Sequence, residues 1–254
     1  MSKVIVLDCG FLAFRSILSF RVAMTMPIAH TYLSMLISNL KIAGAKLDDT
    51  IILAKDSRLG SWRREIVPEY KANRKENREK QEDADWWSEC FKETDEILNK
   101  INLCLPYHII CVDFCEADDV ASVCCKVFKD RELILVSSDS DWTMLLINKN
   151  VKILSIITKK FKTVENPLQV LQDKIMKGDR ADNLIGKPQT EEELIKRRTV
   201  VNLLELPDYV ENPIKEKLLN LPIKNIEYNK IPFRSLRERV WKLYNEGGAN
   251  GYIR

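Results

Sequence analysis

Five short apolar runs in the first 157 residues of the 254-residue chain constrain its fold most strongly. They read VIVLD (4–8), TIILAKD (50–56), YHIICVD (107–113), ELILVSSD (132–139) and VKILSII (151–157). Runs that are continuously apolar are typical of strands covered on both faces. Helical patterns alternate with them at 31–43, 84–102, 117–129 and 141–147. This alternation predicts an α/β fold with a mostly parallel central sheet wrapped by helices.

After residue 165 the strand patterns stop, and helical patterns continue at about 166–177, 191–205, 213–220 and 234–245. We therefore expect an α/β core over 1–165 and a helical C-terminal region over 166–254. No apolar stretch approaches the roughly 18 residues of a membrane span, so we expect a cytosolic protein.

The seven cysteines lie mostly in apolar segments, where they resemble small reduced core residues. A zinc site is disfavoured, because Cys111 and Cys115 lack a second ligand pair at finger spacing and the chain has only two histidines, His30 and His108.

Carboxylates follow the predicted strands at equivalent places. Asp8, Asp56 and Asp139 end three of them, Asp141 comes two residues later, and EADD after the third strand supplies Glu116, Asp118 and Asp119. Any one of these residues could be a helix cap. Ligands of open α/β sheets bind at the carboxyl ends of the strands, so we expect the acids to converge on one site.

Asp179 and Asp182 form a further pair, spaced to share one face of a helical turn. Oxygen ligands without His or Cys favour Mg²⁺ or Mn²⁺. The excess of carboxylates predicts two or more ions, which together would promote displacement at phosphorus. Basic residues predominate at 55–80 and 215–242 and acidic residues at 82–96, a distribution that favours phosphate binding around a cation-holding centre.

Five ordered motifs resemble the flap endonuclease and 5′ nuclease superfamily. They are VLDCGFLAFRS (6–16), AKDSRLGSWRREIVPEYKANR (54–74), EADDVAS (116–122), SSDSDW (137–142) and GDRADN (178–183). The short chain is most similar to phage RNase H-type members, which resemble the 5′ nuclease domain of bacterial DNA polymerase I.

The resemblance implies roles for all nine acids. Asp8, Asp56, Glu116 and Asp118 would surround a first metal, and Asp119 and Asp139 would lie close to both metals. Asp141, Asp179 and Asp182 would serve the second metal.

The resemblance also implies a helical arch at about 70–100, through which single strands pass. Tyr70 would stack on a base, Lys71 and Arg74 would contact the scissile phosphate, and Arg64 is a weaker candidate for that phosphate. Without the acids, core packing of Tyr70 and a solvated helix face for Lys71 and Arg74 would be the simpler interpretation. Lys75 and Arg78 are expected to bind nucleic acid, and the tryptophans at 86 and 87 to anchor the far end of the arch in the core, with base stacking as the alternative.

One departure from the superfamily follows the last acidic motif. Members usually carry a glycine-rich helix-two-turn-helix there, which grips duplex backbone through amides and often a K⁺ ion. This chain has NLIGKPQTEEELIKRRT, in which Gly186 is the sole glycine. We expect duplex binding to depend instead on the side chains of Lys187, Lys196, Arg197 and Arg198.

The resemblance implies a Mg²⁺-dependent, structure-specific 5′ nuclease, active as a 5′-3′ exonuclease and flap endonuclease in DNA replication and repair. Its substrates would be branched, nicked or RNA-primed DNA, including RNA–DNA hybrid, and Mn²⁺ would substitute for Mg²⁺. A single-strand-binding protein, a sliding clamp and a polymerase are implied partners of a monomer in a bacterial or phage-infected cytosol. Two alternatives stay open: a PIN-type single-strand endoribonuclease and a non-catalytic branched-DNA-binding module.

Overall fold

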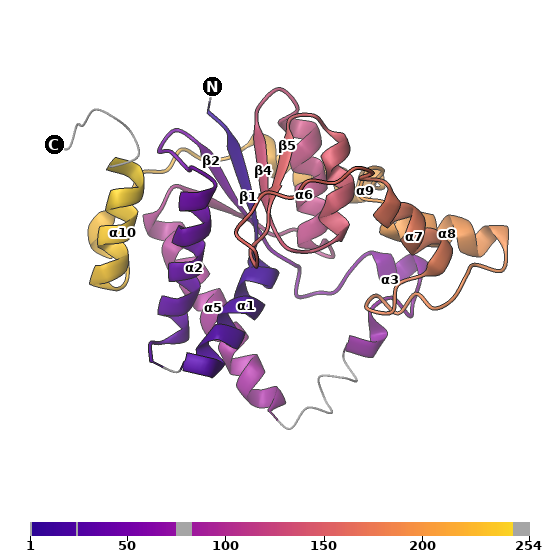
Figure 1. Cartoon of the computed structure of the whole chain (residues 1–254), viewed down its shortest axis with the longest axis horizontal. Coiled ribbons are helices and arrows are strands. Elements are labelled where there is room, and N and C mark those ends of the chain that lie inside the picture. The colour runs from indigo at the N-terminus through magenta and orange to yellow at the C-terminus, as the bar shows by residue number, and fades with distance from the viewer. Residues whose placement is uncertain (1, 24, 75–82, 246–254) are drawn as a thin grey trace.

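A computed structural model describes residues 2–23, 25–74 and 83–245 (Figure 1). Its centre is a five-stranded sheet of order β3-β2-β1-β4-β5, in which every neighbouring pair is parallel. The strands are β1 (Val4–Asp8), β2 (Thr50–Ala54), β3 (Tyr107–Ile110), β4 (Leu133–Val136) and β5 (Val151–Leu154). The predicted parallel α/β fold is confirmed. Four of the five predicted runs extend past the strand ends, because their last residues already belong to the loops that follow the strands.

Helices connect the strands. They are α1 (Cys9–Ala23), α2 (Ile28–Ile42), α3 (Arg63–Ile66), α5 (Ala84–Cys104), α6 (Ala117–Val127), the 3₁₀ helix η1 (Asp141–Ile147), α7 (Gln169–Lys177), α8 (Glu191–Val201), α9 (Asp208–Leu219), the 3₁₀ helix η2 (Tyr228–Lys230) and α10 (Arg234–Asn245). The sequence patterns did not predict α1, and 141–147 is a 3₁₀ helix. Among the described helices, none is long and apolar enough to cross a bilayer.

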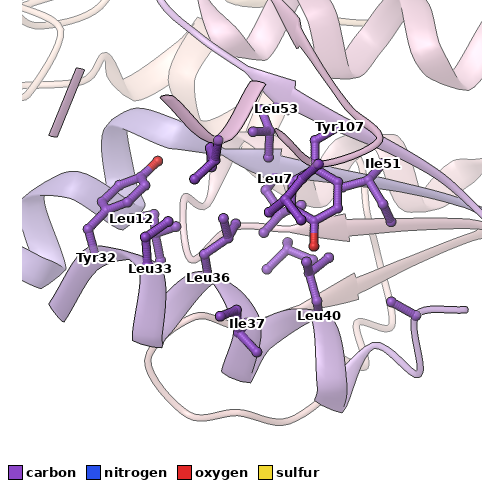
Figure 2. Close-up of a cluster of buried hydrophobic side chains, with 14 of the residues drawn as sticks. Leu7, Leu12, Tyr32, Leu33, Leu36, Ile37, Leu40, Ile51, Leu53 and Tyr107 are labelled. Carbon is purple, nitrogen blue, oxygen red and sulfur yellow. The ribbon is translucent and has the colours of Figure 1, made fainter. Parts of the chain in front are cut away.

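Alternate residues of β1 enter two different cores. Ile5 and Leu7 face the cluster formed with α1, α2, α5 and α10 (Figure 2), whereas Val4 and Val6 face the cluster formed with α6, η1 and α9. This is the reason for the continuously apolar runs, since both faces of each central strand exclude water. The C-terminal helices are divided between the two cores: α9 packs beside α6 and α10 beside α2 (Figure 1).

The parallel register sets the position of the acids. Leu7 lies opposite Leu53 on one side and Val136 on the other, so β1, β2 and β4 end at one edge of the sheet. In Figure 1, α3, α7 and α8 lie to one side of the sheet.

The two tryptophans at the start of α5 anchor it to α1. The Trp87 ring stacks on Phe14 with centroids 5.6 Å apart, and the Trp86 ring stacks on Phe20 at 6.4 Å. Both also pack against the small core around Ile17. This placement agrees with the anchoring interpretation.

Candidate active site

Asp8 occupies the last position of β1 and is almost fully buried. Its oxygens accept hydrogen bonds from the Phe11 N–H at 2.9 Å and the Ser137 hydroxyl at 2.8 Å. Burial, together with the charges of Asp56 and Asp139, raises the pKa of Asp8 to about 7. Burial is the largest cause of this rise, and the two neighbouring carboxylates add to it.

Asp56 lies two residues beyond the end of β2 and accepts the N–H of Ala117 at 2.8 Å. Burial, followed by the charge of Glu116, raises its pKa. Space here is tight, because a Cβ at Gly10 would lie 3.3 Å from the Asp56 Oδ2. The start of α1 thus passes directly beside this acid.

Glu116 caps the N-terminus of α6 and also belongs to the acid cluster. It forms a capping box with Asp119. The Lys71 ammonium lies 2.9 Å from both Glu116 oxygens, and the Arg63 guanidinium lies 3.3 Å from one. Burial alone would raise the pKa of Glu116, but the charges of Lys71 and Arg63 lower it to about 2. Glu116 therefore caps α6 and also contributes its carboxylate to the acid cluster.

The Asp119 side chain is fully buried. Its carboxylate accepts two hydrogen bonds from Arg63, at 3.1 and 2.7 Å, and one from the Trp62 indole at 3.1 Å. The remaining hydrogen bond comes from the Glu116 N–H at 2.8 Å. The resemblance implied a position near both metals; in this structure the Asp119 carboxylate contacts Arg63 and the start of α6.

The carboxylates form a first acid group of Asp8, Asp56 and Glu116 and a second acid group of Asp141, Asp179 and Asp182. Asp118 lies between the two acid groups. The indole of Trp142, in η1, donates to it at 2.6 Å. Burial and then the charge of Asp139 raise its pKa well above the usual range, with Glu116 and Asp141 adding to the effect. The pKa of Asp118 is therefore raised by carboxylates of both acid groups.

The second acid group surrounds one lysine. The Lys174 Nζ, at the end of α7, lies 2.5 Å from Asp141, 2.5 Å from Asp179 and 3.3 Å from Asp182. Burial and the charge of Asp139 raise the pKa of Asp141 in spite of this lysine. Burial acts in the same direction on Asp179, but its bond to Lys174 keeps the pKa of Asp179 below the usual value.

A closed loop, not the predicted helical turn, carries Asp179 and Asp182. Gly178 ends α7 at φ +84°, and a Cβ there would come 2.2 Å from the Leu184 carbonyl oxygen. Asp179 and Leu184 then exchange two backbone hydrogen bonds, at 2.7 and 2.8 Å, and Asn183 is left-handed at φ +59°. The loop places both carboxylates beside Lys174. The two side chains thus face the same group, as predicted, but the backbone between them forms a loop and not a helical turn.

The EYKANR segment docks on this loop. The Lys71 N–H donates to the Asp182 carbonyl at 2.9 Å, and Arg74 donates to the Asp182 carboxylate at 3.0 Å. The side-chain amides of Asn73 and Asn183 add cross-links to the Arg180 and Glu69 carbonyls. Lys71 and Arg74 are thereby held at the boundary between the two acid groups.

Tyr70 packs in the core. Its ring is 3% exposed, against Leu184, Val200 and Val201, and its hydroxyl donates to Glu116 at 3.2 Å. Base stacking would require a free ring face, so the structure favours the core-packing alternative. Arg64 is exposed, and its guanidinium donates to the Tyr70 carbonyl at 3.1 Å.

The remaining predicted nucleic-acid contacts have different environments. Lys187, Lys196 and Arg198 are exposed, and Lys196 pairs with Glu192 at 2.6 Å. Arg197 instead binds the carbonyls of Gly186 and Ile185, at 2.5 and 3.1 Å, so it holds the loop before α8. Lys75 and Arg78 lie outside the described residues.

Sequence reasoning missed three cations. Arg63 is buried and joins Asp119, Glu116 and the Val200 carbonyl. Lys174 joins the second acid group, and the Lys162 ammonium donates to the Asp139 carbonyl at 2.9 Å. No local pattern distinguishes these residues from other charged side chains of the chain, because only the fold brings them to the acids.

The chemistry of the cluster suits hard divalent cations. Its donors are carboxylate oxygens, and Asp8, Asp56, Asp118 and Asp141 have raised pKa values, so additional positive charge would be stabilising. Within the described part of the chain, no three acidic or other metal-binding side chains are already arranged to hold one ion. N–H groups of lysines, an arginine and an indole already donate hydrogen bonds to several of these oxygens. These groups would have to move away before an ion could bind.

Comparison with known proteins identifies the family. The model of the family described as 5′-3′ exonuclease, N-terminal resolvase-like domain, matches residues 3–176. Ribonuclease H of Enterobacteria phage T4 is 31% identical over 163 residues, which are 62% of this chain and 52% of that protein. A 5′-3′ exonuclease of Mycoplasmopsis pulmonis is 34% identical over 150 residues, 54% of this chain and 46% of that protein. The chain thus spans about half the length of these curated relatives.

Solved structures show the same fold. The bacteriophage T5 5′-exonuclease with bound zinc aligns with a TM-score of 0.71 at 21% identity, over 86% of this chain and 98% of that one. A T5 flap endonuclease complex with DNA and metal ions aligns at 0.61 and 18% identity, over 94% and 97%. The family match covers most of the chain and includes the acids that follow the strands, and the fold agrees along nearly the whole length. The chain belongs to the 5′-3′ exonuclease family.

Proposed function

We propose that this protein is a divalent-cation-dependent, structure-specific 5′ nuclease. It would hydrolyse phosphodiesters near the 5′ ends of branched, nicked or RNA-primed DNA. The observation that carries the proposal is the convergence of carboxylates from the ends of β1, β2 and β4, the start of α6 and the loop after α7, in a chain of this family.

Two sets of residues would hold Mg²⁺, with Mn²⁺ as a substitute. The first set is Asp8, Asp56, Glu116 and Asp118, and the second is Asp141, Asp179 and Asp182, with Asp139 next to both. Bound Mg²⁺ ions would supply an activated water and neutralise charge on the phosphate. Asp119 keeps a positioning role, because Arg63 and Trp62 hold it.

Lys71 is the residue we assign to the scissile phosphate. It is 15% exposed in its side chain, it lies between Glu116 and Asp182, and its backbone N–H is tied to the Asp182 carbonyl. A cation fixed in this way stabilises negative charge that develops on a phosphate without needing to reorganise. Arg74, whose side chain is 46% exposed, is placed to bind the same strand.

The proposed substrate class rests on the relatives. The names of the T4 and T5 proteins refer to ribonuclease H, 5′-exonuclease and flap endonuclease, and one T5 structure contains DNA. Exposed Lys187, Lys196 and Arg198 would contact duplex phosphates. A polymerase, a single-strand-binding protein and a sliding clamp are proposed partners, and we propose that the protein acts as a monomer in the cytosol.

A 5′-labelled flap substrate tests the function. Cleavage near the junction in Mg²⁺, lost in EDTA and in Asp139→Asn, is the expected result. A duplex-free RNA of the same sequence serves as the comparison: preferential cleavage of this RNA would favour a PIN-type ribonuclease. Flap binding in Ca²⁺ without cleavage in Mg²⁺ or Mn²⁺ would favour a non-catalytic binding module.

A further inference from the structure

Lys174 lies where a cation of the second acid group would lie. Its Nζ is within 3.3 Å of Asp141, Asp179 and Asp182, and the residue is 8% exposed. An ammonium has three N–H donors, and three carboxylates receive them here. The second acid group is thus already closed around a positive charge that belongs to the chain.

The fold fixes this ammonium. The Lys174 carbonyl accepts the N–H of Gly178, and the left-handed Gly178 turns the chain so that Asp179 and Asp182 close back over the helix end. Lys177, three residues further along α7, contrasts with it: its side chain is 71% exposed and pairs with Asp173 on the same helix. A place in the last turn of α7 is therefore not sufficient to bury a lysine side chain among carboxylates.

The ammonium and a divalent ion require the same oxygens. Mg²⁺ binds carboxylate oxygens at about 2.0–2.1 Å, whereas the Lys174 nitrogen already lies 2.5 Å from two of these carboxylates. Two cations in one cluster of this size would also repel one another strongly. Occupation by one must exclude the other from the same position.

We propose that Lys174 is a positioning residue that holds the second metal subsite in the absence of the ion and withdraws when the ion binds. This inference rests on the proposed function. In this arrangement the carboxylates of Asp141, Asp179 and Asp182 stay collected around one cation at all times. The affinity for the second ion is lowered by the free energy needed to displace the ammonium, so the subsite fills only at higher ion concentration than the first.

A Mn²⁺ titration of the folded full chain tests the proposal. Binding of Mn²⁺ is measured by calorimetry and by the EPR signal of free Mn²⁺. Lys174→Met removes the charge and keeps most of the length, and Lys177→Met is the matched control on the same helix. For Lys174→Met we expect the second ion to bind about tenfold or more tightly, as for a coupling of usual size. The first ion should bind as in the wild type, and Lys177→Met should match the wild type for both ions.

A second measurement is made on the wild-type protein, and a substitution serves only to assign the signal. The ¹⁵N signal of the Lys174 ammonium, assigned by its absence in Lys174→Arg, should shift or broaden as Mg²⁺ is added to the wild type. Lys224 is the internal reference, because its ammonium donates to the Tyr107 and Asn102 carbonyls at 2.7 and 3.2 Å. Its signal should not change.

The outcomes separate the two proposals. If the wild type binds two ions but Lys174→Met binds the second no more tightly, or the Lys174 signal does not change, the displacement idea is wrong and the nuclease proposal stands. If the wild type binds no Mn²⁺ and cleaves no flap, both proposals are wrong.

Discussion

The Arg63 guanidinium donates hydrogen bonds to both carboxylate oxygens of Asp119 in the core. The Arg63 side chain is 2% exposed and the Asp119 side chain 0%. The Arg63 Nε donates to the Val200 carbonyl at 2.7 Å. One ion pair thereby ties the start of α6, which carries Glu116 and Asp118, to the end of α8. Glu116 and Asp118 depend on it for their position.

Replacing Arg63 should be costly. Arg63→Met leaves the buried Asp119 charge without its partner, and we expect the free energy of unfolding to fall by about 3–5 kcal/mol. Urea denaturation would measure the change. The neighbouring exposed Arg64 provides the control, since Arg64→Met should cost about 0.5 kcal/mol or less. Equal effects of the two substitutions would contradict this assignment.

Asp8→Asn should change how stability depends on pH. Because the pKa of Asp8 rises from 3.8 to about 7 on folding, its ionisation costs stability progressively as pH increases through that window. In EDTA, the variant should match the wild type near pH 4 and exceed it by on the order of 4 kcal/mol above pH 7. A stability difference that is constant over this range would refute the burial argument. Cleavage in Mg²⁺ should be lost.

Lys71→Ala should act on the chemical step. A cation at the reacting phosphate counts most where charge develops, so we expect the single-turnover rate to fall about 10²- to 10³-fold while flap affinity in Ca²⁺ changes only a few fold. Lys177→Ala, which removes an exposed charge paired with Asp173, is the control and should leave the rate unchanged. An effect of Lys71→Ala confined to affinity would remove it from the catalytic step.

The two glycines that flank the Asp179–Asp182 loop permit a matched test. Both have left-handed φ, +84° at Gly178 and +67° at Gly186, but only at Gly178 would a Cβ meet backbone, 2.2 Å from the Leu184 oxygen. Gly186→Ala should cost about 1 kcal/mol from conformation alone. Gly178→Ala should cost several kcal/mol and abolish cleavage, as measured by denaturation and flap assay. Similar costs at the two sites would mean that the close approach is not needed.

Arg197 and Arg198 should have separable roles in duplex binding. Arg198→Ala should weaken duplex binding and lower the salt slope by about one unit, because its side chain is 63% exposed. Arg197→Ala removes the bonds to the Ile185 and Gly186 carbonyls and should mainly reduce stability, by about 1–2 kcal/mol. Exchange of K⁺ for Na⁺ at equal ionic strength should not alter duplex affinity; a K⁺-specific gain would indicate that the loop binds the ion through its backbone.

The sequence by itself determined the sheet and the origin of most acids. Continuous apolar runs and intervening helical patterns are local properties, so they predict parallel strands, and parallel strands carry Asp8, Asp56 and Asp139 to one edge regardless of side-chain detail. The helix α1 was missed because its apolar residues are not confined to one face. The ordered motifs then specified the family.

Only the tertiary structure decided how the charges are paired. Asp119 and Asp118 are adjacent in sequence, yet one turns inward to Arg63 and the other lies between the two acid groups. Lys174 and Lys177 are three residues apart on one helix, yet one is enclosed by three carboxylates and the other is exposed. Arg63 and Asp119 are 56 positions apart and Lys174 and Asp141 are 33 positions apart, so no local pattern in the sequence could predict that these side chains meet.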